Sequence, residues 1–351
     1  MNEEREPLSP ALAALLQAGP LPLRPRLEVR LTLPDLQPWR GGNALPGVWS
    51  FAAEAPGPHV AVLAATHGNE IGGAVMLDRW LRSGLRPRRG RLSLILGNLE
   101  ALARFDAEDP TASRFIDEDL NRLWDEETLA GGRRSNELRR ARALRPLLDT
   151  VDLLLDLHSM LWPSDPLFLT GTPPRAAQLA HSLGLPALVV ADEGHDAGPR
   201  IIDYARFSDP AGGCTALLLE AGSHWERETV ATMEAVAARL LRLTGLVAAE
   251  APLPHPPPAA PPPRIARVTR TVTARSPGFA FLQPYRGGHV VAKRNTLIAL
   301  DGEEEIRTPH DDCLLVMPSL RVMPGQTAVR LARFLAAPPV EAPPAAGAPD
   351  A

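Results

Sequence analysis

The sequence predicts an α/β fold with a mixed, mostly parallel sheet flanked by helices, followed by a smaller C-terminal all-β domain. Short apolar runs alternate with helical segments between residues 48 and 243, which is typical of a sheet covered by helices on its faces. A proline-dense stretch, 252–263, comes next, and proline at this density favours an extended linker over a packed core. Beyond it, short alternating segments separated by turn residues indicate a small β module.

These features divide the chain into five parts. An N-terminal extension precedes the α/β domain, and a Pro-rich linker joins that domain to the β-rich domain. The composition of the final Ala/Pro-rich segment predicts a disordered tail. The predicted boundaries are 1–24, 25–250, 251–264, 265–335 and 336–351.

Hydrophobic periodicity predicts the elements within these parts. In the α/β domain we expect strands at 27–32, 48–53, 60–65, 92–96, 151–155, 167–170, 187–191 and 216–219. We expect helices at 73–81, 136–148, 174–183 and 226–243, with a short one near 11–18. Residues 104–128 are expected to be irregular and charged. The expected strands of the C-terminal domain are 268–273, 289–292, 296–299 and 314–316.

Composition excludes several classes of function. The chain has 351 residues, of which 45 % are hydrophobic, so it can bury a sizeable core. Its net charge of −4 and pI near 6.2 provide no basic surface for nucleic acid. We interpret the arginine clusters at 86–91 and 139–145 as solvated faces. No apolar run approaches the ~18 residues of a membrane span, and no signal peptide is visible at the N-terminus.

The two cysteines, Cys214 and Cys313, are far apart in the sequence and lie in apolar surroundings. This favours free thiols in a reducing compartment over a disulfide. Together with the composition, the cysteines predict a cytoplasmic protein with no membrane or nucleic-acid partner.

Metal-binding residue types follow two of the expected strands. His67 and Glu70 lie in the stretch AATHGNE, just past one apolar run, and His158 ends the segment DLH after another. Imidazole nitrogens and a carboxylate oxygen are good zinc ligands, and a His₂Glu set leaves the open position that a catalytic zinc requires. The sequence therefore predicts one Zn²⁺ per chain at the carboxyl ends of parallel strands, where ligands gather. Against this, a single histidine at a strand end is more often an ordinary surface or core residue, and the same ligands suit other divalent metals.

Two carboxylates lie near these ligands. Asp156 precedes His158 by two residues, so in a straight strand both side chains leave on the same side. Asp156 can then orient His158 or cap a neighbouring loop. Glu220 ends the run LLLE, where an ionised carboxylate is costly unless it is paired or functional. Near a metal, Glu220 can act as a general base and then as a general acid, and the alternative is a salt bridge to an arginine.

The stretch SRFIDEDLNRLW supplies candidate substrate contacts. Arg114 can stabilise an oxyanion, and Asn121 with Arg122 can hold a carboxylate. The pattern by itself also fits a charged surface loop.

Four motifs occur together and in order: H-G-N-E, SRFIDEDLNR, DLH and a strand ending in E-A-G. In this the chain resembles the succinylglutamate desuccinylase/aspartoacylase family, which is similar to the zinc carboxypeptidases of the M14 type. The resemblance covers residues 55–250 well and 265–335 more loosely. It implies an α/β/α zinc-peptidase domain followed by a β-rich domain. It also implies zinc at His67, Glu70 and His158, general base and acid chemistry at Glu220, carbonyl polarisation by Arg114, substrate carboxylate binding by Asn121 and Arg122, and support of that loop by Asp119.

The chain departs from the family pattern in three places. DLH is followed by Ser159-Met160-Leu161-Trp162, which is bulkier and more apolar than the small polar residues of aspartoacylases. A second substrate arginine is not matched by a motif, and Arg200 and Arg206 are the candidates. The aromatic hydroxyl that the C-terminal domain gives to the site is missing from MPSLRVMPGQ, and Tyr285 lies much earlier.

The sequence therefore predicts a zinc-dependent hydrolase that cleaves the amide bond of an N-acyl amino acid or a similar small carboxylate. One alternative is a zinc carboxypeptidase or amidase acting on a peptide or cell-wall fragment, and the β module decides between them, because a capped cleft admits only small substrates. Another alternative is a non-catalytic protein that binds a small anion, although such a protein has no need for both Glu70 and Glu220. The sequence leaves open whether the protein forms a homo-oligomer.

Overall fold

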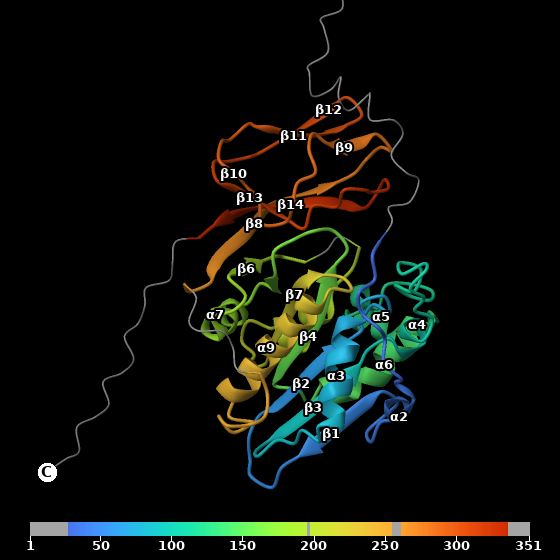
Figure 1. The fold of residues 1–351 in the computed structure, drawn as a ribbon. Coiled ribbons are helices and arrows are strands. Elements are labelled where there is room, and N and C mark those ends of the chain that lie inside the picture. Colours follow the sequence, from blue (N-terminus) through green and yellow to red (C-terminus); the bar gives the residue numbers. More distant parts are fainter. Residues whose placement is uncertain (1–26, 195–196, 255–260, 336–351) are drawn as a thin grey trace, which may run out of the picture.

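The computed structural model describes residues 27–194, 197–254 and 261–335. The expected helix near 11–18 and the tail 336–351 lie outside these residues, as does the centre of the linker. Figure 1 shows a helix-covered sheet in one part of the molecule and the C-terminal strands stacked at one end of it.

One sheet of eleven strands runs through the molecule, in the order β1-β3-β2-β4-β7-β5-β6-β8-β14-β13-β10. Its first seven strands by position are β1 (Val48–Ala52), β3 (Arg91–Leu96), β2 (His59–Ala64), β4 (Leu153–Met160), β7 (Thr215–Ser223), β5 (Leu167–Thr170) and β6 (Leu188–Ala191). Strands β3, β2, β4 and β7 are parallel, whereas β1 and β5 pair antiparallel with β3 and β7. The predicted mixed, mostly parallel sheet is confirmed, and the carboxyl ends of β2, β4 and β7 lie side by side.

Helices cover both faces of this sheet because its strands are apolar on both sides. Val60, Val62 and Ala64 of β2 belong to one core cluster, and Ala61 and Leu63 to the other. The first face is covered by α3 (Gly72–Arg82), α7 (Pro174–Leu183) and α9 (Arg227–Leu243), and the second by α6 (Asn136–Leu148). Shorter elements are α2 (Gln37–Arg40), α4 (Leu99–Leu102), η1 (Leu120–Arg122), α5 (Glu126–Ala130), η2 (Ile201–Asp203) and α8 (Ala205–Ser208).

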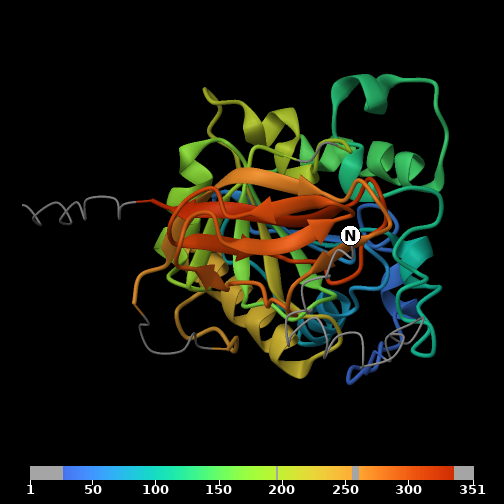
Figure 2. The same ribbon diagram turned by 90° about the horizontal axis from the view of Figure 1, so that it is seen from above.

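The C-terminal strands continue the same sheet. Strand β8 (Arg264–Thr273) pairs in parallel with β6, and β14 (Thr327–Phe334), β13 (Cys313–Val316) and β10 (Val290–Val291) follow antiparallel. A second sheet, β12-β11-β9, is formed by Glu304–Arg307, Leu297–Asp301 and Phe279–Phe281. Seen from above, these strands lie across the middle of the helix-covered body (Figure 2). The separate β sheet agrees with the predicted β-rich region, and the exact division into domains stays a prediction.

Three expectations about the elements were wrong. Residues 27–32 keep their alternation, and Arg30 N–H donates to the Trp225 carbonyl (3.2 Å), but no strand ladder forms there in the described part of the chain. Strands β4 and β7 run past their expected ends, so His158 and Glu220 lie inside strands. The expected list also omitted β9, β12 and β14. Ladder partners extend these strands, and a single sequence does not show such partners.

The expectation about the two cysteines is met. Both Cys214 and Cys313 are free thiols, with Cys313 buried and Cys214 half-buried. Among the described residues, no helix combines the length and apolarity needed to cross a lipid bilayer.

Candidate active site

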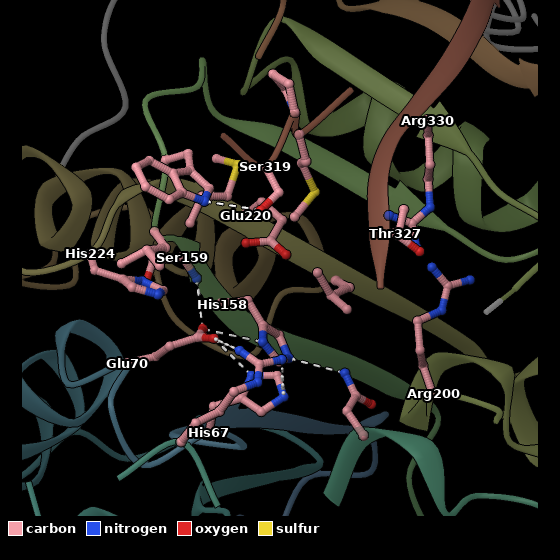
Figure 3. Close-up of a pocket in the computed structure, with 18 of the residues that line it drawn as sticks. His67, Glu70, His158, Ser159, Arg200, Glu220, His224, Ser319, Thr327 and Arg330 are labelled. Carbon is pink, nitrogen blue, oxygen red and sulfur yellow. Dashed lines mark hydrogen bonds and ion pairs between the residues drawn. The ribbon is translucent and has the colours of Figure 1, made fainter. Parts of the chain in front are cut away.

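A cavity of about 220 Å³ lies where β2, β4 and β7 meet the C-terminal strands. All seven residues predicted for the site line it, together with side chains that were not predicted (Figure 3). The predicted ones are His67, Glu70, Arg114, Asn121, Arg122, His158 and Glu220.

Three side chains form a buried cluster at the floor of the cavity. His67, Glu70 and His158 each offer one ligand atom, and these atoms lie within 4.8 Å of one another. The Nδ1 atom of His67 is 2.7 Å from Glu70 Oε1, and Nδ1 of His158 is 3.3 Å from Glu70 Oε2. The backbone N–H of Ser159 also donates to Glu70 Oε2 (2.8 Å), which fixes the carboxylate. This set of donors can bind a metal ion.

Carboxylates hold the opposite edge of both imidazole rings. Nε2 of His67 is 2.9 Å from Asp119 Oδ1, and Nε2 of His158 is 2.8 Å from Asp156 Oδ2. When these Nε2 atoms carry the proton, both Nδ1 lone pairs face the cluster, which is the usual arrangement around a metal-ligating histidine. Asp156 also accepts a hydrogen bond from Thr66 (3.0 Å), so it orients His158 and holds the loop after β2. The residues present therefore fit a divalent cation with an open coordination position.

The cluster is strongly coupled electrostatically. Burial alone would raise the pKa of Glu70, but His67 and His158 outweigh it and hold that pKa well below its usual value. Burial alone would lower the pKa of His158, yet Asp156 and Glu70 raise it well above the ordinary range. Glu70 is therefore an anion that favours a positive charge at this point, and a metal ion would supply that charge.

Glu220 lies on β7 directly beside His158 in the sheet register. Its side chain is buried, and its Oε2 atom has no hydrogen-bond partner in the described structure. Burial raises the pKa of Glu220 to about 8. No ion pair with an arginine forms within the described residues, so the salt-bridge alternative has no support there. Figure 3 shows the carboxylate facing the cavity near Glu70 and His158.

The loop between α4 and η1 carries the predicted substrate contacts. Arg114 donates to Asp119 Oδ2 (3.2 Å), and its other terminal nitrogen is 3.6 Å from Glu70 Oε1. Asp119 also accepts from the backbone N–H of Asn121 (2.8 Å) and so caps η1 while contacting His67. The expected role of Asp119 as support for the loop thus has a geometric basis, and the same residue reaches the metal cluster.

Asn121 and Arg122 lie at the opposite end of this loop. Asn121 Oδ1 accepts from the N–H of Ile201 (2.7 Å), and its Nδ2 atom is 3.4 Å from Nε2 of His158. Arg122 donates to the Asn121 carbonyl (2.6 Å). Burial lowers the pKa of Arg122 to about 10, against the opposing effect of Asp119. A desolvated guanidinium of this kind favours an anionic ligand.

Further cationic residues line the same part of the cavity. Arg200 is buried and donates to Asp203 (2.7 Å) and Asp192 (3.2 Å). Nε of Arg330, on β14, lies 3.0 Å from the same Asp192 oxygen, but this ion pair lacks hydrogen-bond geometry. Figure 3 shows Arg200, Thr327 and Arg330 on one side of the cavity, and Ser159, His224 and Ser319 on the other.

The two candidates for a second arginine are separated by the fold. Arg200 lines the cavity, whereas Arg206 donates to the Val151 carbonyl (2.7 Å) and is not among the lining residues. Charge alone suggested both residues, and only their positions in the fold distinguish them. Arg330 had no sequence signal, because it lies in a strand that was not predicted.

The opposite side of the cavity is apolar with a buried polar pair. Trp162 donates from Nε1 to Ser319 Oγ (3.1 Å), which joins the segment after β4 to the segment between β13 and β14. Ser159 Oγ lies 2.7 Å from Nδ1 of His224, and burial lowers the pKa of His224 to about 4. Met160, Leu161 and Met317 add apolar surface to the lining of the cavity. Tyr285 is buried beside Phe281 in the C-terminal core and does not line the cavity.

Comparisons with known proteins agree with this geometry. Residues 56–244 match the family described as the succinylglutamate desuccinylase/aspartoacylase catalytic domain. Aspartoacylase of Mus musculus is 32 % identical over 121 residues, which cover 31 % of this chain and 36 % of the mouse protein. The N-acyl-aromatic-L-amino acid amidohydrolase (carboxylate-forming) of Xenopus laevis is 32 % identical over 113 residues, covering 30 % of this chain and 35 % of that protein. The chain spans about a third of the length of these curated relatives.

A solved structure extends the likeness over most of the fold. Succinylglutamate desuccinylase of Vibrio parahaemolyticus aligns with a TM-score of 0.64 and 20 % identity, covering 83 % of this chain and 87 % of that chain. At this identity the likeness shows the fold, including the C-terminal strands. The family match itself spans more than half of the sequence. The chain therefore belongs to the succinylglutamate desuccinylase/aspartoacylase family.

Proposed function

We propose that this protein is a zinc-dependent hydrolase that cleaves the amide bond of an N-acyl amino acid or a similar small carboxylate. The observation that carries the proposal is the buried Glu220 side chain, which shares one cavity with the His67–Glu70–His158 cluster and whose Oε2 has no hydrogen-bond partner among the described residues. The names of the relatives support the same class, since they are deacylases of amino acids.

The metal we propose is zinc, bound by Nδ1 of His67, the carboxylate of Glu70 and Nδ1 of His158. When bound, zinc polarises a carbonyl oxygen and lowers the pKa of a water to roughly 7. Asp156 orients His158 for this binding. Nε2 of His67 lies 2.9 Å from both Asp119 Oδ1 and Arg114 Nη2, which orient that ring.

Each residue of the site has a separate role in the proposed reaction. Glu220 takes a proton from the attacking water and returns it to the leaving nitrogen. Burial raises the pKa of this carboxyl group, which makes its carboxylate a stronger base. With a divalent cation held by the cluster, the pKa of Glu220 would fall and its carboxylate would ionise near neutral pH. Arg114 donates to the oxygen that gains negative charge. Asn121 positions Arg122, and Arg122 binds the substrate carboxylate with Arg200 next to it.

The C-terminal strands favour a small substrate over a peptide. Thr327 and Arg330 of β14 and Ser319 of the preceding segment line the cavity, which has a volume of about 220 Å³. Ligand pockets that hold drug-sized molecules are typically ~300–1,000 Å³. The small volume of the cavity therefore favours an acylated amino acid over a peptide or a cell-wall fragment as the substrate.

The test of this proposal is a hydrolysis screen with the zinc-loaded protein. N-acetyl, N-succinyl and N-formyl amino acids are incubated with the protein, and the released amine is measured. We expect turnover of at least one acyl amino acid, its loss on chelation, and its return with zinc. Binding of these compounds without turnover of any would favour the small-anion binding protein instead.

Removing Arg114 tests its assigned role. Arg114→Ala is expected to keep zinc and to lower kcat by about 10²–10³, the usual effect of losing one oxyanion donor. Metal analysis and steady-state kinetics measure both quantities. Arg104→Ala, an exposed arginine that does not line the cavity, is the control. Undiminished kcat in Arg114→Ala would remove this residue from the mechanism.

A further inference from the structure

The loop that carries Arg114 and leads into η1, where Asn121 lies, has little regular structure of its own, yet it must hold both side chains in place. Residues 113–119 contain no helix or strand. Their backbone N–H groups therefore need partners outside the loop. The structure supplies these partners from one side chain on the neighbouring helix α6.

The carboxylate of Glu137 accepts hydrogen bonds from the backbone of this loop. Its Oε1 atom accepts from the N–H of Ile116 (2.6 Å), and its Oε2 atom accepts from the N–H of Asp117 (3.1 Å) and of Glu118 (3.3 Å). The Nδ2 atom of Asn98 adds a fourth hydrogen bond, to Oε1 (2.9 Å). Glu137 is fully buried, and within the described residues it forms no ion pair.

The contacts between helix and loop are reciprocal. Asp117 of the loop accepts from the backbone N–H (2.7 Å) and the side-chain amide (2.8 Å) of Asn136 at the start of α6. Glu118 of the loop pairs with Arg133, just before the helix. These contacts add to the hydrogen bonds of Glu137 and join the loop to the start of α6.

Asn98 extends this arrangement to the metal cluster. Its Oδ1 atom caps α4 by accepting from the N–H of Ala101 (3.2 Å). Gly68, next to His67, packs so closely on α4 that an added Cβ would lie 2.3 Å from the Ala101 carbonyl carbon. Gly68 N–H also donates to the Arg114 carbonyl (3.0 Å). The segments that carry His67 and Arg114 therefore rest on the structure that Glu137 holds together.

We infer that Glu137 is a positioning residue: it fixes the loop 113–122 so that Arg114 lies at the metal cluster. A carboxylate suits this role because both of its oxygens only accept hydrogen bonds, as four donors require. Glutamine has the same shape but presents one amide NH₂ group, which faces N–H groups instead of accepting from them. The catalytic part of this inference rests on the proposed function.

The first test compares Glu137→Gln with Glu234→Gln, which removes a carboxylate of another helix that pairs with Arg79. We expect Glu137→Gln to keep its zinc and to lose about 30- to 100-fold in kcat, because a displacement of about 1 Å can cost 10²-fold. We expect the control to keep wild-type kcat. In the Glu137→Gln background, Arg114→Ala should cost less than about tenfold, since residues that act as a unit are not additive.

The second test does not depend on turnover. Hydrogen exchange of the amides of residues 116–118 should become at least about tenfold faster in Glu137→Gln, with β4 unchanged. If Glu137→Gln does not fold, Asn98→Ala removes one donor and should show the same changes at smaller size.

The outcomes separate the two claims. Absence of turnover in the wild-type screen defeats the proposed function, while accelerated exchange still supports the role of Glu137 in the loop. Unchanged exchange at 116–118, or full additivity of the two substitutions, overturns the positioning role.

Discussion

Glu220→Gln is expected to retain zinc and to lower kcat by about 10²–10⁴, the range attributed to a lost general acid–base group. Glutamine keeps the size of the side chain but cannot take a proton from water or return it to the leaving nitrogen. The buried carboxylate has no structural partner at Oε2, so its loss should leave the fold intact. Metal analysis measures the bound zinc, and kinetic measurements of the variant and the wild-type protein give the loss in kcat.

The pH profile adds a second readout for this variant. Burial raises the pKa of Glu220, and the group must be ionised to act as a base. Activity of the wild-type protein should therefore rise with pH as Glu220 loses its proton, and this rise should be absent in Glu220→Gln. Glu226→Gln, which removes a carboxylate paired with Arg30, is the matched control. A variant that turns over at the wild-type rate would show that Glu220 is not the base.

His158→Ala is expected to abolish both zinc binding and activity. It removes one of three ligands and leaves the fully buried Asp156 without its imidazole partner. We expect near-complete loss of bound zinc after dialysis, measured by metal analysis, and no detectable turnover.

Two further variants distinguish the loss of a zinc ligand from simple unfolding of the protein. Asp156→Asn keeps all three ligands and weakens the hydrogen bond to His158, so zinc affinity should fall by about 10–100-fold. His181→Ala, on the distant helix α7, should bind zinc as the wild-type protein does. Full zinc occupancy in a folded His158→Ala protein would contradict the assigned ligand set.

The grouping of His67, Glu70 and His158 was predictable because its signal is local. His67 and Glu70 follow a fully apolar run, and His158 follows another, so parallel pairing of these runs brings the ligands together. The structure adds that His158 and Glu220 are direct neighbours across β4 and β7. That pairing depends on register between strands far apart in the chain, which no short motif shows.

Other parts of the cavity depend on the tertiary fold and were not predictable in this way. Arg200 lies in an irregular loop, and only its buried contacts with Asp192 and Asp203 distinguish it from Arg206. Arg330 comes from β14, where arginines interrupt the apolar pattern. The role of Glu137 was also invisible, because a glutamate in the first turn of a helix is ordinarily a solvent-exposed residue that favours the helix dipole.

The parallel pairing of β6 with β8 has a consequence for how the molecule can be dissected. Strand β14, which lines the cavity, belongs to the same sheet as β4 and β7. The C-terminal strands therefore cannot move away from the cavity as a unit without breaking the ladder between β6 and β8. A truncated chain that stops before residue 264 would expose β6 as a bare edge, open to pairing with other chains. Such a fragment should therefore aggregate rather than serve as a minimal enzyme.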